Sequence, residues 1–343
     1  MEILIGRFSC VRMIGLLVGL FLLSGCSQLT YRATGQVLTH YSEQEAVPYL
    51  LASDDPDMAC ALSEAFGPFM FSFEKVGASA EKMKILLYMM AGSCAESRSW
   101  NPELRYLRAL RRNDATETQD ALIEQKRFLL QAAQRDYLSY STLVKIMGNG
   151  ETCPRFANSQ DEFLWLVGLL SGLQAVFADI AVEHQSNVSL DTTQKVAHAA
   201  TCLDSARWWG VPLAIQSAVA ASLPASDETI QAALKNLAVA SAMGVKQKVR
   251  LAQVLEAQIY FSKGKTDQVK RVIREYAQEK KQTPADPAMK LFDQVAAMQL
   301  LAISDRLWTE AKGVRTPLSG FGTFWDDVAP AADGDKNSLL DGL

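Results

Sequence analysis

Histidine is scarce in this sequence, and the few copies present lie far apart. The 343 residues contain three histidines, His40, His184 and His198, and no Cys-x-x-Cys pair. A structural zinc site needs closely spaced Cys and His ligands, so we expect no metal. The sequence also lacks a nucleophile elbow, a phosphate-binding glycine-rich loop and a dinucleotide fingerprint. It therefore predicts neither a cofactor nor catalysis.

An excess of basic residues is missing as well. Lys and Arg number 34 against 38 Asp and Glu, which gives a formal net charge of −4. Nucleic-acid-binding domains carry basic patches, so we expect no nucleic-acid partner. Beyond the first 25 residues we also expect no segment that is long and apolar enough to cross a membrane.

Sustained alternation of apolar and polar residues is absent, which argues against half-buried strands. Apolar residues instead recur at spacings of three and four, as at Leu234, Leu237 and Ala238. Capping residues, some followed by proline or an acid, predict helix starts at Asp55-Pro56, Ser79, Asn101-Pro102, Ser159, Ser226, Thr266 and Asp286-Pro287. Glycines predict helix ends at Gly77, Gly148, Gly210, Gly244 and Gly264. We expect an all-α fold of stacked antiparallel helical hairpins, either an α-solenoid or an irregular helical bundle.

The N-terminus has the pattern of an export signal. Arg7 and Arg12 precede an apolar run over residues 13–23 that is too short for a permanent membrane span. The run leads into Leu23-Ser24-Gly25-Cys26, a lipobox, which predicts cleavage before Cys26 and lipid attachment to its thiol. More than one acyl chain, at roughly 0.8 kcal/mol per buried methylene, makes such an anchor stable. The alternatives are a cleaved secretory signal or an uncleaved anchor helix with an incidental thiol.

The residue after the cysteine bears on location. It is Ser27 rather than Asp, which by resemblance to the sorting rules of Gram-negative lipoproteins favours the periplasmic face of the outer membrane.

We divide the chain into a signal peptide (1–25), a lipid-anchored linker (26–40), a helical-repeat domain (41–314) and a flexible tail (315–343). In the tail, Phe321, Phe324 and Trp325 either cap the last helix pair or dock a partner.

Four cysteines follow the predicted anchor. Cys60, Cys94, Cys153 and Cys202 are an even number, which fits disulfides in an oxidising compartment. Three pairings are possible, and we favour Cys60 with Cys94 and Cys153 with Cys202, because each ties a helix to a near neighbour in sequence. The alternative is that some are buried thiols that pack as small hydrophobes.

Two clusters of large apolar residues are candidates for a ligand pocket. Four rings, Phe66, Phe69, Phe71 and Phe73, surround Gly67-Pro68, which predicts a break in a helix. Three methionines on the next helix, Met83, Met89 and Met90, are suited to an adaptable wall for a hydrophobic ligand. The alternative for both clusters is ordinary core packing.

A pair of tryptophans, Trp208 and Trp209, precedes Gly210 and Pro212 at a predicted helix end. Half-exposed indoles at such a place can serve recognition. The alternative is a turn packed by two large rings.

One hairpin is more specific. Between Lys248 and Tyr276, the residues Ala257, Tyr260 and Gly264 are spaced as in the tetratricopeptide repeat, in which paired helices stack closely. An ordinary helical hairpin is the alternative. With the lipobox, the segment Ala206 to Gly210 and the helical hairpins from Leu234 to Tyr276, the chain resembles the T-component lipoproteins associated with TRAP transporters. The resemblance implies a helical periplasmic protein, in some cases a homo-oligomer, that assists a solute-binding protein in delivering small ligands, and it implies no catalytic residues.

These observations lead to one expected function and two alternatives. We expect a non-catalytic lipoprotein whose helical surface binds a small, hydrophobic ligand or a periplasmic protein partner in the service of uptake. The first alternative is a scaffold for cell-envelope assembly. The second is a helical enzyme that acts on peptidoglycan, for which Glu96-Ser97 is the only local resemblance.

Overall fold

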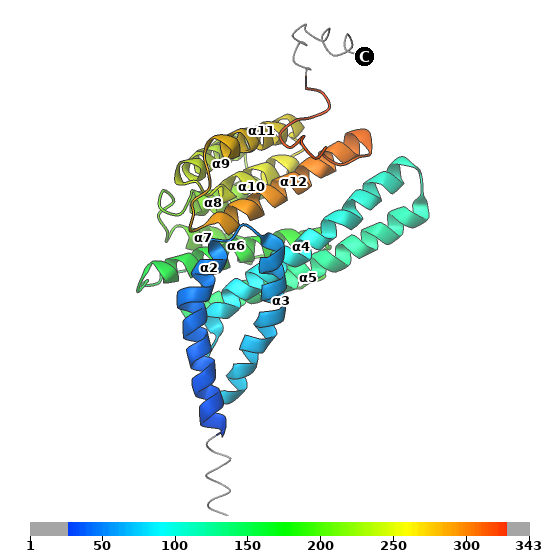
Figure 1. Ribbon diagram of the computed structural model, residues 1–343. Coiled ribbons are helices and arrows are strands. Elements are labelled where there is room, and N and C mark those ends of the chain that lie inside the picture. The colour runs from blue at the N-terminus through cyan, green and yellow to red at the C-terminus, as the bar shows by residue number, and fades with distance from the viewer. Residues whose placement is uncertain (1–26, 328–343) are drawn as a thin grey trace, which may run out of the picture.

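The computed structural model describes residues 27–327, and in that range every regular element is a helix (Figure 1). The all-α prediction is confirmed. The helices of the body are α3 (Pro56–Ser72), α4 (Glu81–Arg111), α5 (Ala115–Met147), α6 (Ser159–Ala181), α7 (Thr192–Ala200), α8 (Val211–Ser222), α9 (Asp227–Gln247), α10 (Leu251–Ser262), α11 (Thr266–Gln282) and α12 (Lys290–Lys312). A short 3₁₀-helix, η2 (Phe73–Val76), follows α3.

An N-terminal arm, residues 27–51, projects from the body beside α3 (Figure 1). Residues 27–41 are helical, and the π-helical turn η1 (Ser42–Ala46) joins them to α2 (Val47–Leu51). Pro48 has no amide hydrogen, so the α-helical ladder is interrupted where the π-turn lies. Residues 27–40, predicted as a linker, are thus helical, whereas Cys26 and the predicted signal peptide lie outside the described residues.

Consecutive helices of the body pack against each other as antiparallel pairs. The hairpin of α4 and α5 is the longest, and α6 packs along α5. The later helices stack in pairs from α7 to α11. The last helix, α12, returns across the molecule to contact α4 and α10, and it also reaches α2 and α3. This return brings the first turns of α12 to the base of the N-terminal arm.

Helix α6 corrects the expectation that no later segment is long and apolar enough to cross a membrane. Its 23 residues have a mean hydropathy of 1.8 in the most apolar window, yet 72% of that window is buried in the protein. Trp165 is fully buried, and its Nε1 donates to the carbonyl of Ala199, 3.1 Å away. α6 is therefore the central helix of the body.

Predicted helix starts are confirmed where a side chain caps the first turn of the helix. Asp55 and Ser226 cap α3 and α9 through their side chains. The prediction of a helix start at Asn101-Pro102 is wrong, because α4 continues through Pro102, with α5 packed along it and Arg105 bonded to Glu117 (2.8 Å).

A predicted helix break and a predicted helix end are also wrong, in both cases because of packing against another part of the chain. α3 runs through Gly67-Pro68 without a break, since its packing on α4 outweighs the hydrogen bond that Pro68 cannot donate. Gly244 lies inside α9, where it permits close approach: a Cβ there would stand 2.8 Å from the carbonyl oxygen of Val249.

The tryptophan pair belongs to the core. Trp208 and Trp209 are 7% and 8% exposed, and both rings pack against Phe163. Trp208 Nε1 donates to Glu162 Oε2 at 2.8 Å. The packed-turn interpretation is confirmed, and the idea of half-exposed indoles used in recognition is wrong because α6 and α12 cover them.

The C-terminal hairpin forms as predicted, with α10 and α11 joined at Gly264, whose φ is +67°. Residues 315–327 pack against α11 and α12 rather than away from them. Phe324 is 4% exposed, Trp325 packs on Trp308 at 5.6 Å, and Lys270 Nζ bonds Asp326 at 2.6 Å. The aromatic residues of the predicted tail thus cap the last helix pair, and residues 328–343 lie outside the described residues.

Candidate functional site

An apolar pocket of about 340 Å³ lies between the N-terminal arm, α3, α4 and α12. This volume is within the range of roughly 300–1,000 Å³ that is usual for small-molecule sites. Nearly all of its lining side chains are aliphatic, aromatic or methionine, and the hydroxyls of Tyr41, Ser42 and Ser93 are the polar exceptions. Such a wall favours a ligand that is itself apolar.

Four of the predicted pocket residues line this space. They are Phe66 on α3 and Met83, Met89 and Met90 on α4. The two helices form neighbouring walls, because α3 folds back on α4 after the turn at Gly77. The structure therefore brings together side chains from both sequence clusters.

The other predicted pocket residues lie elsewhere. Phe69 is 51% exposed and packs on Phe73 with ring centroids 5.3 Å apart, and Phe71 packs on Tyr88 at 5.0 Å. Trp208 and Trp209 do not line the pocket, but Trp209 packs at 5.9 Å against Phe292, which does. These rings support the walls or face outward rather than into the pocket.

Sequence reasoning missed two walls of the pocket. The arm contributes Leu38, Tyr41, Val47 and Leu50, and α12 contributes a second set comprising Leu291, Phe292, Val295 and Met298. The spacing of three and four in the arm was a usable signal of an amphipathic helix. No local pattern could show that α12, which begins only at Lys290, packs beside it.

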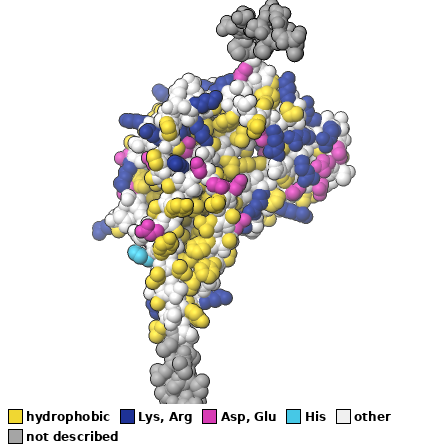
Figure 2. Space-filling view, in the orientation of Figure 1, with side chains coloured by type: hydrophobic (Ala, Val, Ile, Leu, Met, Phe, Trp, Pro, Cys, Tyr) yellow, Lys and Arg dark blue, Asp and Glu magenta, His cyan; other side chains and the backbone are white. Residues whose placement is uncertain are grey.

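The arm also exposes apolar side chains on its outer surface. Leu29, Val37 and Tyr49 are 68%, 68% and 82% exposed. Figure 2 shows hydrophobic side chains gathered over the projecting part of the molecule formed by the arm and α3. The mouth of the pocket is thus set in an apolar surface.

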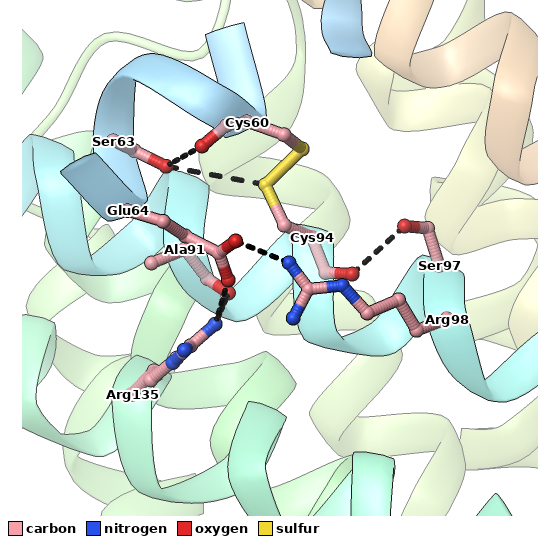
Figure 3. A network of polar contacts seen from close by, with 8 residues as sticks. All are labelled: Cys60, Ser63, Glu64, Ala91, Cys94, Ser97, Arg98 and Arg135. Atoms are coloured by element: carbon pink, nitrogen blue, oxygen red, sulfur yellow. Dashed lines mark hydrogen bonds and ion pairs between the residues drawn. A yellow bond between two sulfur atoms is a disulfide. The ribbon is translucent and has the colours of Figure 1, made fainter.

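A polar and covalent network fixes α3 as a wall of the pocket (Figure 3). A disulfide joins Cys60 on α3 to Cys94 on α4, with the Cα atoms 5.6 Å apart. Glu64 accepts hydrogen bonds from Arg98 on α4 and from Arg135 on α5, the latter at 2.5 Å. Burial raises the pKa of Glu64, but the two arginines outweigh it and leave the pKa below its ordinary value.

The second disulfide joins the loop after α5 to the turn after α7. Cys153 and Cys202 have Cα atoms 5.4 Å apart. Both favoured pairings are confirmed, and the alternative of buried free thiols is wrong for these four residues. Two disulfides are typical of an oxidising compartment outside the cytoplasm.

Within residues 27–327, no group of three or more His, Cys, Asp or Glu side chains is placed to hold a metal ion. No family model, no curated protein and no solved structure matches this chain. The resemblance to TRAP-associated lipoproteins stays a prediction.

Proposed function

We propose that this protein is a lipid-anchored, non-catalytic binding protein outside the cytoplasm that holds a hydrophobic small molecule or acyl chain in the apolar pocket. The observation that carries the proposal is the lining: Phe66, Met83 and Met89 meet apolar side chains of the arm and of α12 around about 340 Å³. Methionine side chains adapt to ligands of different shape, and apolar burial supplies the free energy of binding.

The arm relates the pocket to the predicted anchor. The described part of its helix starts at Ser27, the residue next to Cys26 in the sequence, and Leu38 lines the pocket. At 1.5 Å per residue, Leu38 lies about 17 Å along the helix from Ser27. With Cys26 lipidated, the pocket stands close to the bilayer surface, at the periplasmic face of the outer membrane if Ser27 directs sorting.

Transfer of the bound molecule to a solute-binding protein for TRAP-type uptake is the role we propose for this pocket. A scaffold for envelope assembly is the competing role. Mass spectrometry of gently purified protein separates the two: a co-purified small molecule supports uptake, and outer-membrane proteins without a small molecule support the scaffold.

Ligand binding is tested with protein that has been stripped of bound lipid and titrated with N-phenyl-1-naphthylamine, a neutral fluorescent probe. Met298→Trp places an indole in the pocket from α12, whereas Leu301→Trp adds the same ring on the same helix at a side chain that is 40% exposed and outside the pocket. We expect the probe to bind wild type and Leu301→Trp equally and Met298→Trp at least tenfold more weakly. Equal binding to both variants, or no binding to wild type, contradicts the proposal.

The anchor is tested by growing cells with a palmitate analogue. We expect wild type to be labelled and Cys26→Ala to be unlabelled and released from membranes. An unlabelled wild-type protein rules out the anchor while leaving the pocket intact.

A further inference from the structure

A second, larger cavity of about 560 Å³ lies between the α4–α5 hairpin and α6, α10 and α12. Its walls include apolar side chains, among them Phe177, Ile259 and Phe261, but two carboxyl groups also line it, Glu96 and Asp136. A narrow space of about 50 Å³ lined by the same two acids lies between this cavity and the apolar pocket.

Asp136 is buried without a partner. Its side chain is 5% exposed and lines both spaces, and no hydrogen bond or ion pair to its carboxyl group is found in the described part of the chain. The position is built for this side chain: a Cβ on Gly92 would lie 2.2 Å from Asp136 Oδ1, so only glycine on α4 admits the carboxyl group.

Arg135 and Arg306, the two arginines beside these acids, are already engaged, and Lys263, which also lines the cavity, is exposed to solvent. Arg135 bonds Glu64 and the carbonyl oxygen of Ala91, and Arg306 bonds Glu103 (2.6 Å) and Glu310 (3.0 Å). Glu96 receives only a long contact of 3.5 Å from Gln299. Burial and the nearby Glu96 raise the pKa of Asp136 well above its ordinary value, and burial together with Glu103 raises the pKa of Glu96 to about 7.

A second acceptor in this cavity lacks a donor among the described residues. The side-chain oxygen of Gln258 on α10 is buried without a hydrogen-bond donor. Buried acceptors without donors are costly, and a ligand that brings donors removes this cost. The unmet groups are oxygens, so the complementary ligand carries N–H groups. An amine can also take up the proton of a carboxyl group whose pKa is raised, which leaves an ammonium beside a carboxylate. The described residues offer no third acid or histidine for a metal ion here.

We propose that this cavity binds an organic amine, whose ammonium group donates hydrogen bonds to Asp136 and Glu96 while its apolar body packs against Phe177, Ile259 and Phe261. The site is distinct from the apolar pocket in both position and ligand charge. It stands whether or not the apolar pocket binds a hydrophobic molecule.

Isothermal titration calorimetry with hexylamine, and with hexan-1-ol as the neutral molecule of similar size, tests the charge preference. Charge-assisted hydrogen bonds in a desolvated site predict roughly tenfold to 100-fold tighter binding of the amine. The double variant Asp136→Asn/Glu96→Gln keeps the shape of both side chains, and we expect it to lose this preference. Equal binding of amine and alcohol to wild type, or a preference retained in the double variant, overturns the proposal.

The location is tested in the same experiment. Met298→Trp blocks the apolar pocket and does not line this cavity, so we expect hexylamine to bind it as it binds wild type. Nuclear Overhauser effects from hexylamine methylenes to the ring of Phe177 supply a direct readout. Loss of hexylamine binding in Met298→Trp would place the amine in the apolar pocket and refute this site.

Discussion

Two regions of this molecule bury acidic side chains, and they treat them in opposite ways. Between α10 and α12, Asp293 is 1% exposed and lies 2.9 Å from the guanidinium of Arg250, which is itself fully buried. Arg250 also donates to the carbonyl oxygen of Thr283 at 2.6 Å. Between α4 and α5, Asp136 is almost as deeply buried, at 5% exposed, but it lines cavities and forms no ion pair within the described residues.

The difference separates a structural site from a binding site. A buried ion pair holds its helices in one arrangement, and removal of one partner leaves an uncompensated charge. A buried acid that faces an open cavity contributes no such contact and remains available to a ligand. Buried acids that have raised pKa values and no ion-pair partner therefore indicate where this fold binds a ligand.

The largest expected effect is on the paired site. Asp293→Ala leaves the Arg250 guanidinium buried without its counterion, and we expect the free energy of unfolding to fall by about 3–5 kcal/mol. Urea denaturation followed by circular dichroism measures this loss. A change below about 1 kcal/mol would show that the pair does not hold α10 and α12 together.

A smaller change in stability, in the opposite direction, is expected when Glu96 in the second cavity is replaced by Gln. Because the pKa of Glu96 is about 7 in the folded protein and 4.5 is its ordinary value, the folded state binds more protons between these limits. The free energy of unfolding therefore falls as pH rises through this window, by up to about 3 kcal/mol from Glu96 alone. Glu96→Gln removes this contribution, so we expect the variant to be more stable than wild type at pH 8.

Denaturation of both proteins at pH 5 and pH 8 measures the difference. At pH 5, where Glu96 is protonated in the folded state, we expect the two proteins to be nearly equal in stability. A Glu96→Gln variant that is less stable than wild type at pH 8 would mean that the ionised carboxyl group has a stabilising partner in the folded protein.

The smallest change in stability is expected at an exposed ion pair, which serves as a reference for the changes at the two buried sites. Lys195 Nζ on α7 lies 2.6 Å from Oδ2 of Asp191, the residue just before that helix, and the two side chains are 42% and 54% exposed. Solvent screens such a pair, so we expect Lys195→Ala to change the free energy of unfolding far less than Asp293→Ala does. A loss comparable to that of Asp293→Ala would show that burial does not govern the contrast.

Sequence alone was informative where a feature depends on neighbours along the chain. Side-chain caps at Asp55 and Ser226, the turn at Gly264 and the helical period all act within a few residues. It was misleading at Pro68 and Pro102, where a local preference against helix is weaker than the packing of α3 and α5 on α4. The same limit applies to the site, of which the phenylalanine and methionine clusters revealed two walls out of four.

The order of apolar and polar residues along the chain by itself determined that this protein is built of helices and which cysteines could be paired with their neighbours. Only the tertiary structure decided that α12 returns to the arm to close an apolar pocket, and that Glu96 and Asp136 face a common cavity from two helices. Local preferences extend over one or two helical turns, whereas a cavity is the space left between elements distant in sequence, so its position depends on how all of them pack.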